Sequence, residues 1–596
     1  LHEALPIAEE GGFRRLLAEI YFDLAALVQQ AGKIREAGEF AARAVTLSEE
    51  VGDTYLLPSQ LLVLANLKQV EGKPDEALHL LERATDVVEG LLVNVPTPEH
   101  ASTLISAMSR IYVKHFELAV VYEKSVDYIF RILERARGRV LRDVIEQVAA
   151  SESTQRRSSD YIRFQRELNL LQRSLLRLKK TSERQAVLRQ IWEVEQKLIG
   201  AEVEMRTWQG TRSEPVSLSD LRAGLKADQI LVEYVWGEHQ VYALTISRSG
   251  ARVTPLGKRA SVERSTTEYF SLLQRGVDGP AFRKVAASIY GAIVTPLRRP
   301  ASTTKIVIVP DGPLHGLPFD MLATSTRGRL AQTAAISFAP SASVFHALSR
   351  RGKAATELPL LAVGDVLYGD LSKRGNPSRA VGVFDARVTP QLEVLPASRS
   401  EVETALNMAG HGGVGLLGQD ATESRFKRQP LEKFGIIHLA VHAFADPRQP
   451  QRGALLFGPE KSSEEDGFLQ PREIVRLPIK ADLIVLSACN TTVGRSMGQE
   501  GVSNLARAFL SSGATAVLAT SWSVSDTASG SLLKEFYRNL SMRKGAAVAL
   551  RDAKLTLLRR FGPNVLSTVA AFHLIGNGNV VVQLGQERTT GKGAHP

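Results

Sequence analysis

Cysteine is almost missing from this chain, which has one, Cys489, among 596 residues. A single thiol excludes an internal disulfide framework and is typical of a reducing compartment, so we expect the cytoplasm. Long apolar runs are missing as well, since none approaches the roughly eighteen residues that span a membrane. No signal peptide is recognisable, although the chain opens on Leu1 rather than Met, and we expect further sequence upstream.

Aromatic residues are scarce, at 6% of the chain, and few lie in its most arginine-rich stretch, from Arg131 to Arg189. A basic stripe can bind nucleic acid phosphates, and the net charge of +11 allows such a partner. Acidic residues such as Glu134, Asp143 and Glu167 interleave with the arginines here, which favours a solvated helix face. Direct binding of RNA or DNA stays an alternative, with strongly salt-dependent affinity as its signature.

An internal repeat occupies residues 1–150. A shift of forty residues places Gly32-Lys33 on Gly72-Lys73 and Arg43-Ala44 on Arg83-Ala84, with small and apolar residues at helical spacing in each unit. The pattern resembles tetratricopeptide repeats of somewhat lengthened period, already under way where the chain begins. Such repeats stack into an α-solenoid with a concave surface, so we expect a peptide or protein partner there, or a purely structural array.

A helical hairpin is predicted over residues 151–212. Apolar residues spaced alternately by four and three form one stripe, Thr181-Ser182 interrupts it, and a second stripe follows. The first stripe consists of Phe164, Leu168, Leu171, Leu175 and Leu178, and the second of Val187, Ile191, Val194 and Leu198. The hairpin could serve as a lever between the two large regions or as a spacer.

Residues 213–584 alternate strand and helix patterns, which predicts a mainly parallel sheet with helices on both faces. The expected strands are residues 230–235, 241–246, 305–310, 358–364, 434–442, 481–489 and 514–520. Residues 585–596 are rich in glycine and threonine and are predicted to be a disordered tail. The predicted fold class is therefore α followed by α/β.

Two of these apolar runs end in reactive side chains, His442 and Cys489. The carboxyl edge of a parallel sheet is where active sites form, so both side chains should emerge at that edge. A histidine can take the proton of a thiol and later return it to a leaving amine. The pair therefore suggests a Cys-His hydrolase, although a lone buried cysteine is commonly a small core residue.

Several ordered motifs resemble the CHAT domain, a caspase-like module related to separase and found attached to tetratricopeptide repeats in bacteria. They are the stretches from Val309 to Phe319, His438 to His442, Val485 to Thr491, Gly498 to Phe509, Ser521 to Asp526 and Ala570 to Gly576. The resemblance covers roughly residues 216–584. Ordered matches over a whole domain are more specific than any single motif.

The resemblance implies that Cys489 is the nucleophile and His442 the general base and acid of a peptidase that forms an acyl-enzyme. It places the backbone N–H groups of Ala443 and Cys489 in the oxyanion hole, with Ala443 where the family usually has glycine. Asn490 replaces the family's more usual glutamate. Asp526 matches an acidic position that faces a basic residue in the related separases, which implies a substrate pocket; a helix N-cap explains it equally well.

Other chemistries fit less well. His438 and His442 have the spacing of a zinc pair, but they lie on a strand without the acidic base of a metalloprotease helix. The glycine-rich run from Gly410 to Gly415 lacks the Gly-Lys-Ser/Thr ending of a phosphate loop. We therefore predict no metal and no other cofactor. Asp311 and His315 are interpreted as structural residues of the half of the sheet without the site.

Two functions remain open on the sequence. The first is a cytoplasmic cysteine endopeptidase that cuts a protein substrate when a regulatory protein or ribonucleoprotein binds the repeats, in a setting of bacterial defence or cell death that the family suggests. The second is an inactive scaffold that works by binding proteins, which Ala443 and Asn490 motivate. No membrane partner is expected.

Overall fold

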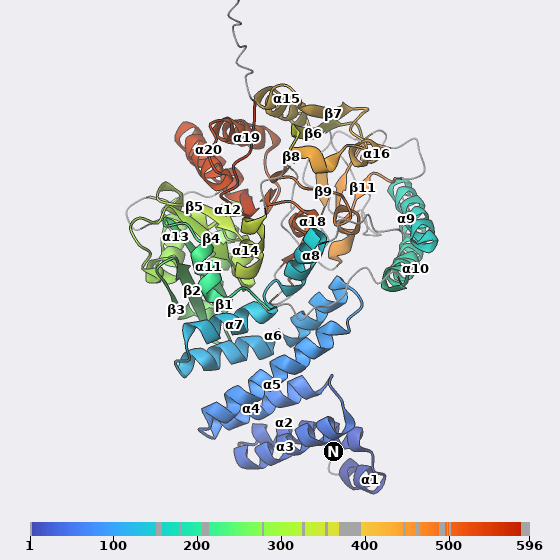
Figure 1. The fold of residues 1–596 in the computed structure, drawn as a ribbon, viewed down its shortest axis with the longest axis vertical. Coiled ribbons are helices and arrows are strands. Elements are labelled where there is room, and N and C mark those ends of the chain that lie inside the picture. The colour runs from blue at the N-terminus through green and yellow to red at the C-terminus, as the bar shows by residue number, and fades with distance from the viewer. Residues whose placement is uncertain are drawn as a thin grey trace, which may run out of the picture.

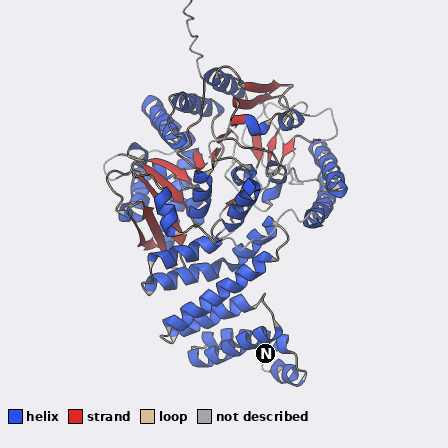
Figure 2. Ribbon diagram, viewed as in Figure 1, coloured by secondary structure: helices blue, strands red, loops and turns tan. Residues whose placement is uncertain are grey.

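The structure, a computed structural model, describes residues 3–150, 158–178, 180–204, 214–276, 279–324, 328–351, 356–368, 395–444, 449–459, 465–487, 495–496, 499 and 502–585. Stacked helices form the N-terminal region, and a sheet flanked by helices forms the rest (Figures 1 and 2). The predicted nucleophile Cys489 and residues 586–596 of the predicted tail lie outside the described residues.

The N-terminal helices pair in antiparallel fashion, as the forty-residue repeat predicts. They are α1 (Ala4–Glu10), α2 (Arg14–Gln30), α3 (Ile34–Val51), α4 (Leu57–Val70), α5 (Pro74–Val93), α6 (Pro98–Val121), α7 (Val126–Ala136) and α8 (Arg139–Ala150). Gly32 lies in the turn between α2 and α3, and Gly72 in the turn between α4 and α5. Their φ values are 79° and 77°, a backbone region that glycine enters without steric cost. Glu123 makes the corresponding turn between α6 and α7 with φ of 49°. The TPR-like repeat prediction is confirmed.

The predicted helical hairpin is present as α9 (Ser159–Arg177) and α10 (Thr181–Glu204). Leu168, Leu175 and Leu198 are buried where the two stripes meet. The hairpin lies beside the sheet region in Figure 1, where Arg452 binds Glu195 at 2.7 Å and Arg476 binds Glu202 at 2.6 Å. Polar contacts therefore fix it against the part of the chain that follows His442.

Eleven strands form the main sheet, in the order β3-β2-β1-β4-β5-β16-β15-β12-β8-β6-β7. Their bounds are β1 (Gln229–Trp236), β2 (Gln240–Ser247), β3 (Gly250–Lys258), β4 (Lys305–Val309), β5 (Ala335–Phe338), β6 (Leu358–Val366), β7 (Val414–Gly418), β8 (Phe434–Leu439), β12 (Leu483–Leu486), β15 (Ala516–Thr520) and β16 (Phe572–Gly576). The small strands β9 (His442–Phe444), β10 (Ala454–Leu456) and β11 (Phe468–Leu469) form a second sheet, and β13 (Arg495–Ser496) pairs with β14 (Val502–Ser503).

The main sheet consists of two halves whose parallel strands run in opposite directions, and β2 is antiparallel to both β1 and β3 at one edge. Strands β1, β4, β5 and β16 are parallel to one another, as are β15, β12, β8, β6 and β7, and the halves meet at the antiparallel pair β15 and β16. The prediction of a mainly parallel sheet is confirmed. The run from Phe434 to His442, predicted as one strand, is divided: β8 ends at Leu439 and His442 begins β9. Burial continues through the break, which explains why the apolar pattern did not reveal it.

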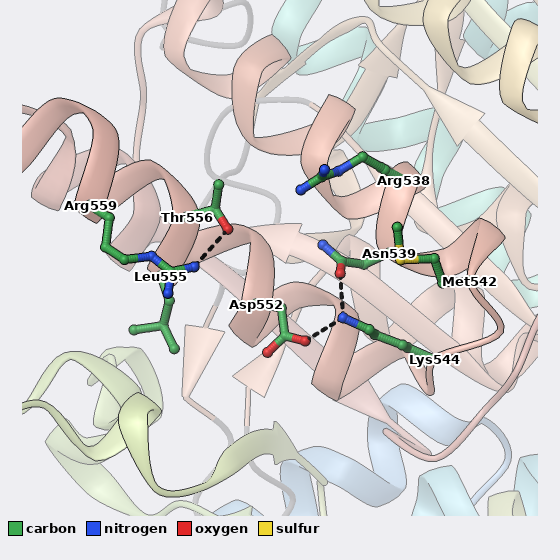
Figure 3. Close-up of a pocket in the computed structure, with 8 residues that line it drawn as sticks. All are labelled: Arg538, Asn539, Met542, Lys544, Asp552, Leu555, Thr556 and Arg559. Atoms are coloured by element: carbon green, nitrogen blue, oxygen red, sulfur yellow. Dashed lines mark hydrogen bonds and ion pairs between the residues drawn. The ribbon is translucent and has the colours of Figure 1, made fainter.

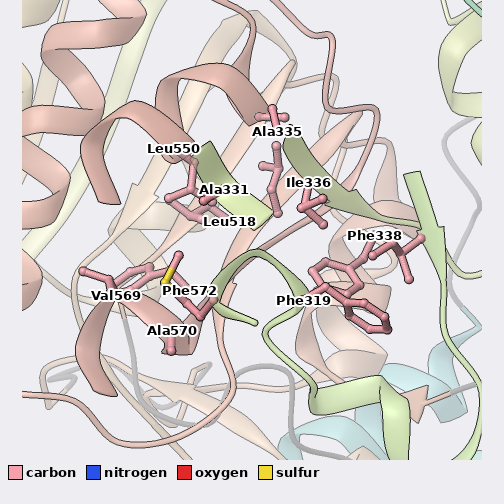
Figure 4. Close-up of a cluster of buried hydrophobic side chains, with 14 of the residues drawn as sticks. Phe319, Ala331, Ala335, Ile336, Phe338, Leu518, Leu550, Val569, Ala570 and Phe572 are labelled. Carbon is pink, nitrogen blue, oxygen red and sulfur yellow. The ribbon is translucent and has the colours of Figure 1, made fainter. Parts of the chain in front are cut away.

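Helices cover the sheet and carry its hydrophobic core. They are α11 (Leu218–Gly224), α12 (Arg259–Gln274), α13 (Pro280–Ile293), α14 (Ala342–Arg350), α15 (Ser398–Ala409), α16 (Glu423–Lys427), α17 (Pro471–Ile474), α18 (Leu505–Ser512), α19 (Asp526–Ser541), α20 (Ala546–Phe561) and α21 (Leu566–Ala571). Figure 4 shows the part of the core in which Leu550 of α20 lies beside Leu518 and Phe572 of the two central strands.

The repeats share a second core with the sheet. Phe116 of α6 makes an edge-to-face contact with Tyr242 of β2, with ring centroids 5.4 Å apart, and both side chains are buried. The last repeat helices are therefore packed on the sheet face as part of one hydrophobic cluster. Among the described helices, none is both long enough and apolar enough to cross a membrane.

Candidate functional site

The two strands that precede the predicted dyad are direct neighbours. β8 and β12 run parallel, their last paired residues are Leu439 and Leu486, and the Ser487 N–H donates to the Leu439 carbonyl at 3.0 Å. His442 follows Leu439 by three residues, and Cys489 follows Leu486 by three residues. The chain therefore leaves two adjacent strands at one level of the carboxyl edge, where α/β proteins form their sites.

His442 is held by Tyr368, which follows β6. The His442 backbone N–H donates to the Tyr368 hydroxyl at 3.0 Å, and that hydroxyl donates to the Leu456 carbonyl at 3.3 Å. The Tyr368 ring lies against the imidazole, with centroids 5.1 Å apart, and burial raises the pKa of its phenol so that the proton stays in place. His442 is 6% exposed, so its position is fixed by β9, β10 and this tyrosine.

Ala443 lies in β9 opposite Leu455 of β10 and is buried. It is not among the described non-glycine residues with positive φ. An alanine therefore adopts this backbone without strain, and glycine is not needed at the position for conformational reasons.

Asp526 is the first residue of α19, but it caps a different helix. Its carboxylate accepts the Ala397 N–H at 2.6 Å, at the start of α15. Burial raises the pKa of Asp526, and the negative charge of Glu401 raises it further. The hydrogen bond from the Ala397 N–H and the charge of His442 act in the opposite direction. The N-cap of α19 is Ser525, so the N-cap role suggested for Asp526 at that helix is wrong, and its carboxylate holds the start of α15 instead. The charge of His442 also acts on this carboxylate.

A fully buried histidine, His438, lies behind the site on β8. Its Nε2 is 2.7 Å from a Glu401 carboxylate oxygen, and its Nδ1 is 2.9 Å from the Tyr537 hydroxyl. The Tyr537 ring stacks on it at 5.6 Å, and burial raises the pKa of that phenol well above its usual value. Both ring nitrogens are engaged, so His438 joins β8 to α15 and α19.

Tyr368, Glu401 and Tyr537 were not predicted from the sequence. Each is brought to the site by a different element, and no local spacing relates them to His442. The repeated histidine in the run from His438 to His442 was the one signal that a second polar group lies at this strand.

Asp311 and His315 lie in the other half of the sheet, after β4. Asp311 accepts the Trp236 N–H at 2.9 Å and pairs with Arg137 at 3.1 Å. Burial lowers the pKa of His315 to about 4, which keeps its imidazole neutral. The contacts of Asp311 agree with the structural role predicted for it.

Arg135, Arg137 and Arg139, three of the arginines that suggested nucleic acid binding, are engaged within the protein. Arg135 binds Glu82 at 2.7 Å and Glu89 at 2.6 Å, both on α5. Arg137 and Arg139 are almost completely buried. This part of the basic stripe therefore joins the repeats to one another and to the sheet.

One group of carboxylates within the described chain is close enough to hold a metal ion: Glu423, Glu465 and Glu473. The Lys427 ammonium already lies 2.8, 2.6 and 2.8 Å from these three side chains. It supplies the positive charge that a cation would bring.

A hollow of about 450 Å³ lies between α19 and α20 and includes none of the predicted site residues (Figure 3). Lys544 crosses it to bind Asp552 at 2.8 Å and Asn539 at 2.7 Å. Its lining contains neither a cysteine nor a histidine.

The fold and the site define a helical-repeat protein joined to an α/β sheet with a histidine at its carboxyl edge. Residues 283–577 match the family model of the CHAT domain, so this part of the chain is a CHAT domain. None of the curated proteins compared with the chain matches it.

Solved structures to which the chain is similar include separase in complex with securin from Saccharomyces cerevisiae, which is 10% identical. The match covers 95% of this chain and 53% of separase, with a TM-score of 0.39. Gingipain R, an arginine-specific cysteine proteinase of Porphyromonas gingivalis, is 9% identical over 52% of this chain and 69% of its own, with a TM-score of 0.31. TPR-like repeats of a kinesin light chain protein are 16% identical over 33% of this chain and 99% of theirs, with a TM-score of 0.14.

Proposed function

We propose that this protein is a cysteine endopeptidase with His442 and Cys489 as its dyad. The observation that supports it best is the register of β8 and β12: the two residues follow paired positions of adjacent parallel strands by the same number of residues. The match to the CHAT family, which covers both residues, supports a peptidase reaction at this place.

In the proposed reaction His442 takes the proton of the Cys489 thiol, and the thiolate attacks the scissile carbonyl to form a tetrahedral intermediate. The backbone N–H groups of Ala443 and Cys489 stabilise its oxyanion, and His442 then protonates the leaving amine. Water, deprotonated by His442, hydrolyses the acyl-enzyme and restores the thiol. Tyr368 sets the position of the imidazole through the His442 backbone.

Asp526 is the proposed acidic group of the substrate pocket. Two observations support this role: the Ala397 N–H donates to its carboxylate, and the charge of His442 acts on its pKa. A carboxylate in this position favours arginine or lysine just before the scissile bond.

The repeats are the proposed docking surface for a regulatory protein or ribonucleoprotein, and the cytoplasm is the proposed location. The shared core of α6 and β2 supports a coupling between partner binding and the peptidase region. Bacterial defence or cell death is the setting that the CHAT family suggests.

The second candidate function is an inactive scaffold. Ala443 and Asn490, the two departures from the usual residues of the family, favour it through their side chains rather than through the backbone conformation at Ala443.

An electrophilic peptide probe with arginine before the reactive carbonyl tests the proposal, because Cys489 is the only thiol. We expect labelling of Cys489 to fall by at least about a hundredfold in His442→Ala, the usual contribution of a general base. His411→Ala, the same change at an exposed histidine, is the matched control. Equal labelling of all three proteins, or no labelling with and without candidate partners, would favour the scaffold.

A further inference from the structure

The helix pair α19 and α20 carries more than half of the chain's net charge. Residues 534–560 contain eight lysine or arginine residues and two acidic residues, a net charge of +6 against +11 for the whole chain. Of these basic residues only Lys554 is buried, where it binds Asp320. The two helices lie side by side at the outside of the sheet region (Figure 1). This part of the surface therefore attracts anions.

The hollow of about 450 Å³ between the two helices collects part of this charge. It is lined by Arg538 in the last turn of α19, Lys544 in the turn that follows, and Arg559 in the last turn of α20. Figure 3 shows Arg538 and Lys544 reaching in from one side and Arg559 from the other. The Arg538 and Lys544 side chains are 49% and 35% exposed, so a ligand can reach them from solvent.

Negative charge within the hollow is already compensated. Of the eight described residues that line it, only Asp552 is acidic, and Lys544 and Arg551 both bind its carboxylate at 2.8 Å. Lys544 donates a second hydrogen bond to Asn539 at 2.7 Å, which leaves one of its three N–H groups for another acceptor. The hollow thus keeps an excess of positive charge after its internal ion pairs are formed.

The two arginines also keep donors for a ligand. Arg538 binds Glu535 at 2.5 Å, and Arg559 donates to the Thr556 hydroxyl at 3.2 Å. Among the described residues, no carboxylate pairs with Arg559. A guanidinium carries five N–H groups, so most donors of each arginine are not used by these contacts.

Stabilisation of the helix dipoles explains only part of this arrangement. A cation in the last turn of a helix interacts favourably with its carbonyl end, and both α19 and α20 have arginine there. Arg560 meets this need on α20 as well as Arg559 does, but it does not line the hollow. The dipoles therefore do not require three cations to converge from both helices and the turn between them on one space.

We propose that this hollow binds a small ligand with two or more linked phosphate groups. Arginine donates paired N–H groups to phosphate oxygens, and lysine adds a point charge. A volume of about 450 Å³ suits a small molecule. None of the eight described lining residues is aromatic, so no ring is present for a nucleobase to stack on. The recognised group is the phosphate chain itself, carried by inorganic polyphosphate or by a nucleoside triphosphate.

Calorimetric titration of the full chain tests the site. Inorganic tripolyphosphate and ATP are titrated separately, with EDTA present so that no metal ion bridges ligand and protein, at about 0.15 M salt. Arg559→Gln and Arg538→Gln each remove one cation from the hollow. Arg560→Gln is the matched control, because it makes the same change at the next residue, which is exposed and outside the lining.

We expect Arg559→Gln to weaken the binding of both ligands by at least about tenfold, the usual effect of losing a hydrogen bond between charged groups. Arg538→Gln should act in the same direction, and Arg560→Gln should change the affinity by less than about twofold at this salt concentration. ATP and tripolyphosphate should bind with similar affinity. Arg559 has no carboxylate partner among the described residues, so its substitution leaves no described acid unpaired and carries the test alone if Arg538→Gln does not fold.

Three results would overturn the proposal. Equal weakening by Arg559→Gln and Arg560→Gln would assign binding to the overall charge of the surface. Binding of ATP without binding of tripolyphosphate would show that the phosphate chain is not the recognised group. Binding of a short single-stranded RNA, with neither small ligand bound, would make this surface a nucleic acid interface instead. None of these outcomes depends on the proposed dyad.

Discussion

Removal of a single oxygen, in Tyr368→Phe, should loosen the histidine of the proposed dyad. The phenylalanine keeps the ring that packs on His442 but loses the hydroxyl that joins the His442 N–H to the Leu456 carbonyl. A buried donor left without a partner costs about 1–3 kcal/mol. Because Tyr368 is 3% exposed, water does not readily replace the hydroxyl.

Hydrogen exchange measures the local stability of β9, which contains His442. If the free energy of opening β9 falls by about 1–3 kcal/mol, amide exchange at residues 442–444 should rise by roughly fivefold to 150-fold, while β1 in the other half of the sheet stays protected. Labelling of Cys489 by the peptide probe should fall by roughly tenfold, since displacement of a catalytic group lowers the rate steeply.

Tyr55→Phe, at a residue that is 65% exposed, is the control for the same chemical change. Unchanged exchange at residues 442–444 together with an unchanged labelling rate would show that Tyr368 does not position His442.

Three further outcomes are expected. Asp526→Asn should lower kcat/KM for substrates with arginine before the scissile bond by at least about tenfold, while substrates with methionine there are spared; equal losses for both would argue against a pocket role. Lys554→Met should lower the thermal unfolding midpoint sharply, because the buried Asp320, which Lys554 binds at 2.6 Å, loses its charge partner at a cost of about 3–5 kcal/mol; an unchanged midpoint contradicts this. Burial raises the pKa of Glu423 from 4.5 to about 8, so the folded protein holds a proton that the unfolded chain releases, and stability should fall as pH rises through this interval. Glu423→Gln should flatten that dependence in unfolding measurements at several pH values, and an unaltered slope would assign it to other groups.

Local patterns predicted the elements well because the signals lie close together in the chain. The forty-residue shift revealed the helix pairs, and the aligned residues Gly32 and Gly72 both have positive φ in the turns of two of these pairs. Buried strands such as β8 and β12 were recognisable as apolar runs in the sequence. The end of β8 at Leu439 was missed because Ala440 and Val441 are buried as well, so burial alone does not show where a strand leaves its sheet.

The residues around His442 could not be predicted from the sequence because they come from segments that are far apart in the chain. Glu401 and Tyr537 meet His438 across 37 and 99 residues, and Arg137 meets Gln499 across 362. Pairings at such separations depend on the order of strands in the sheet, which no local periodicity encodes. Asp526 shows the same limit, since its carboxylate caps a helix that begins more than a hundred residues earlier.

The place of β16 has a consequence for biosynthesis. This strand is the last of the sheet to be made, yet it lies between β5 and β15, where it joins the two halves. A growing polypeptide that has not yet released residues 572–576 from the ribosome leaves both halves with an open edge and Leu518 without its partner Leu574. The half that carries His442 therefore keeps an open edge at β15 until residues 572–576 have been made, and a chain interrupted before them should be a substrate for quality control rather than a working protein.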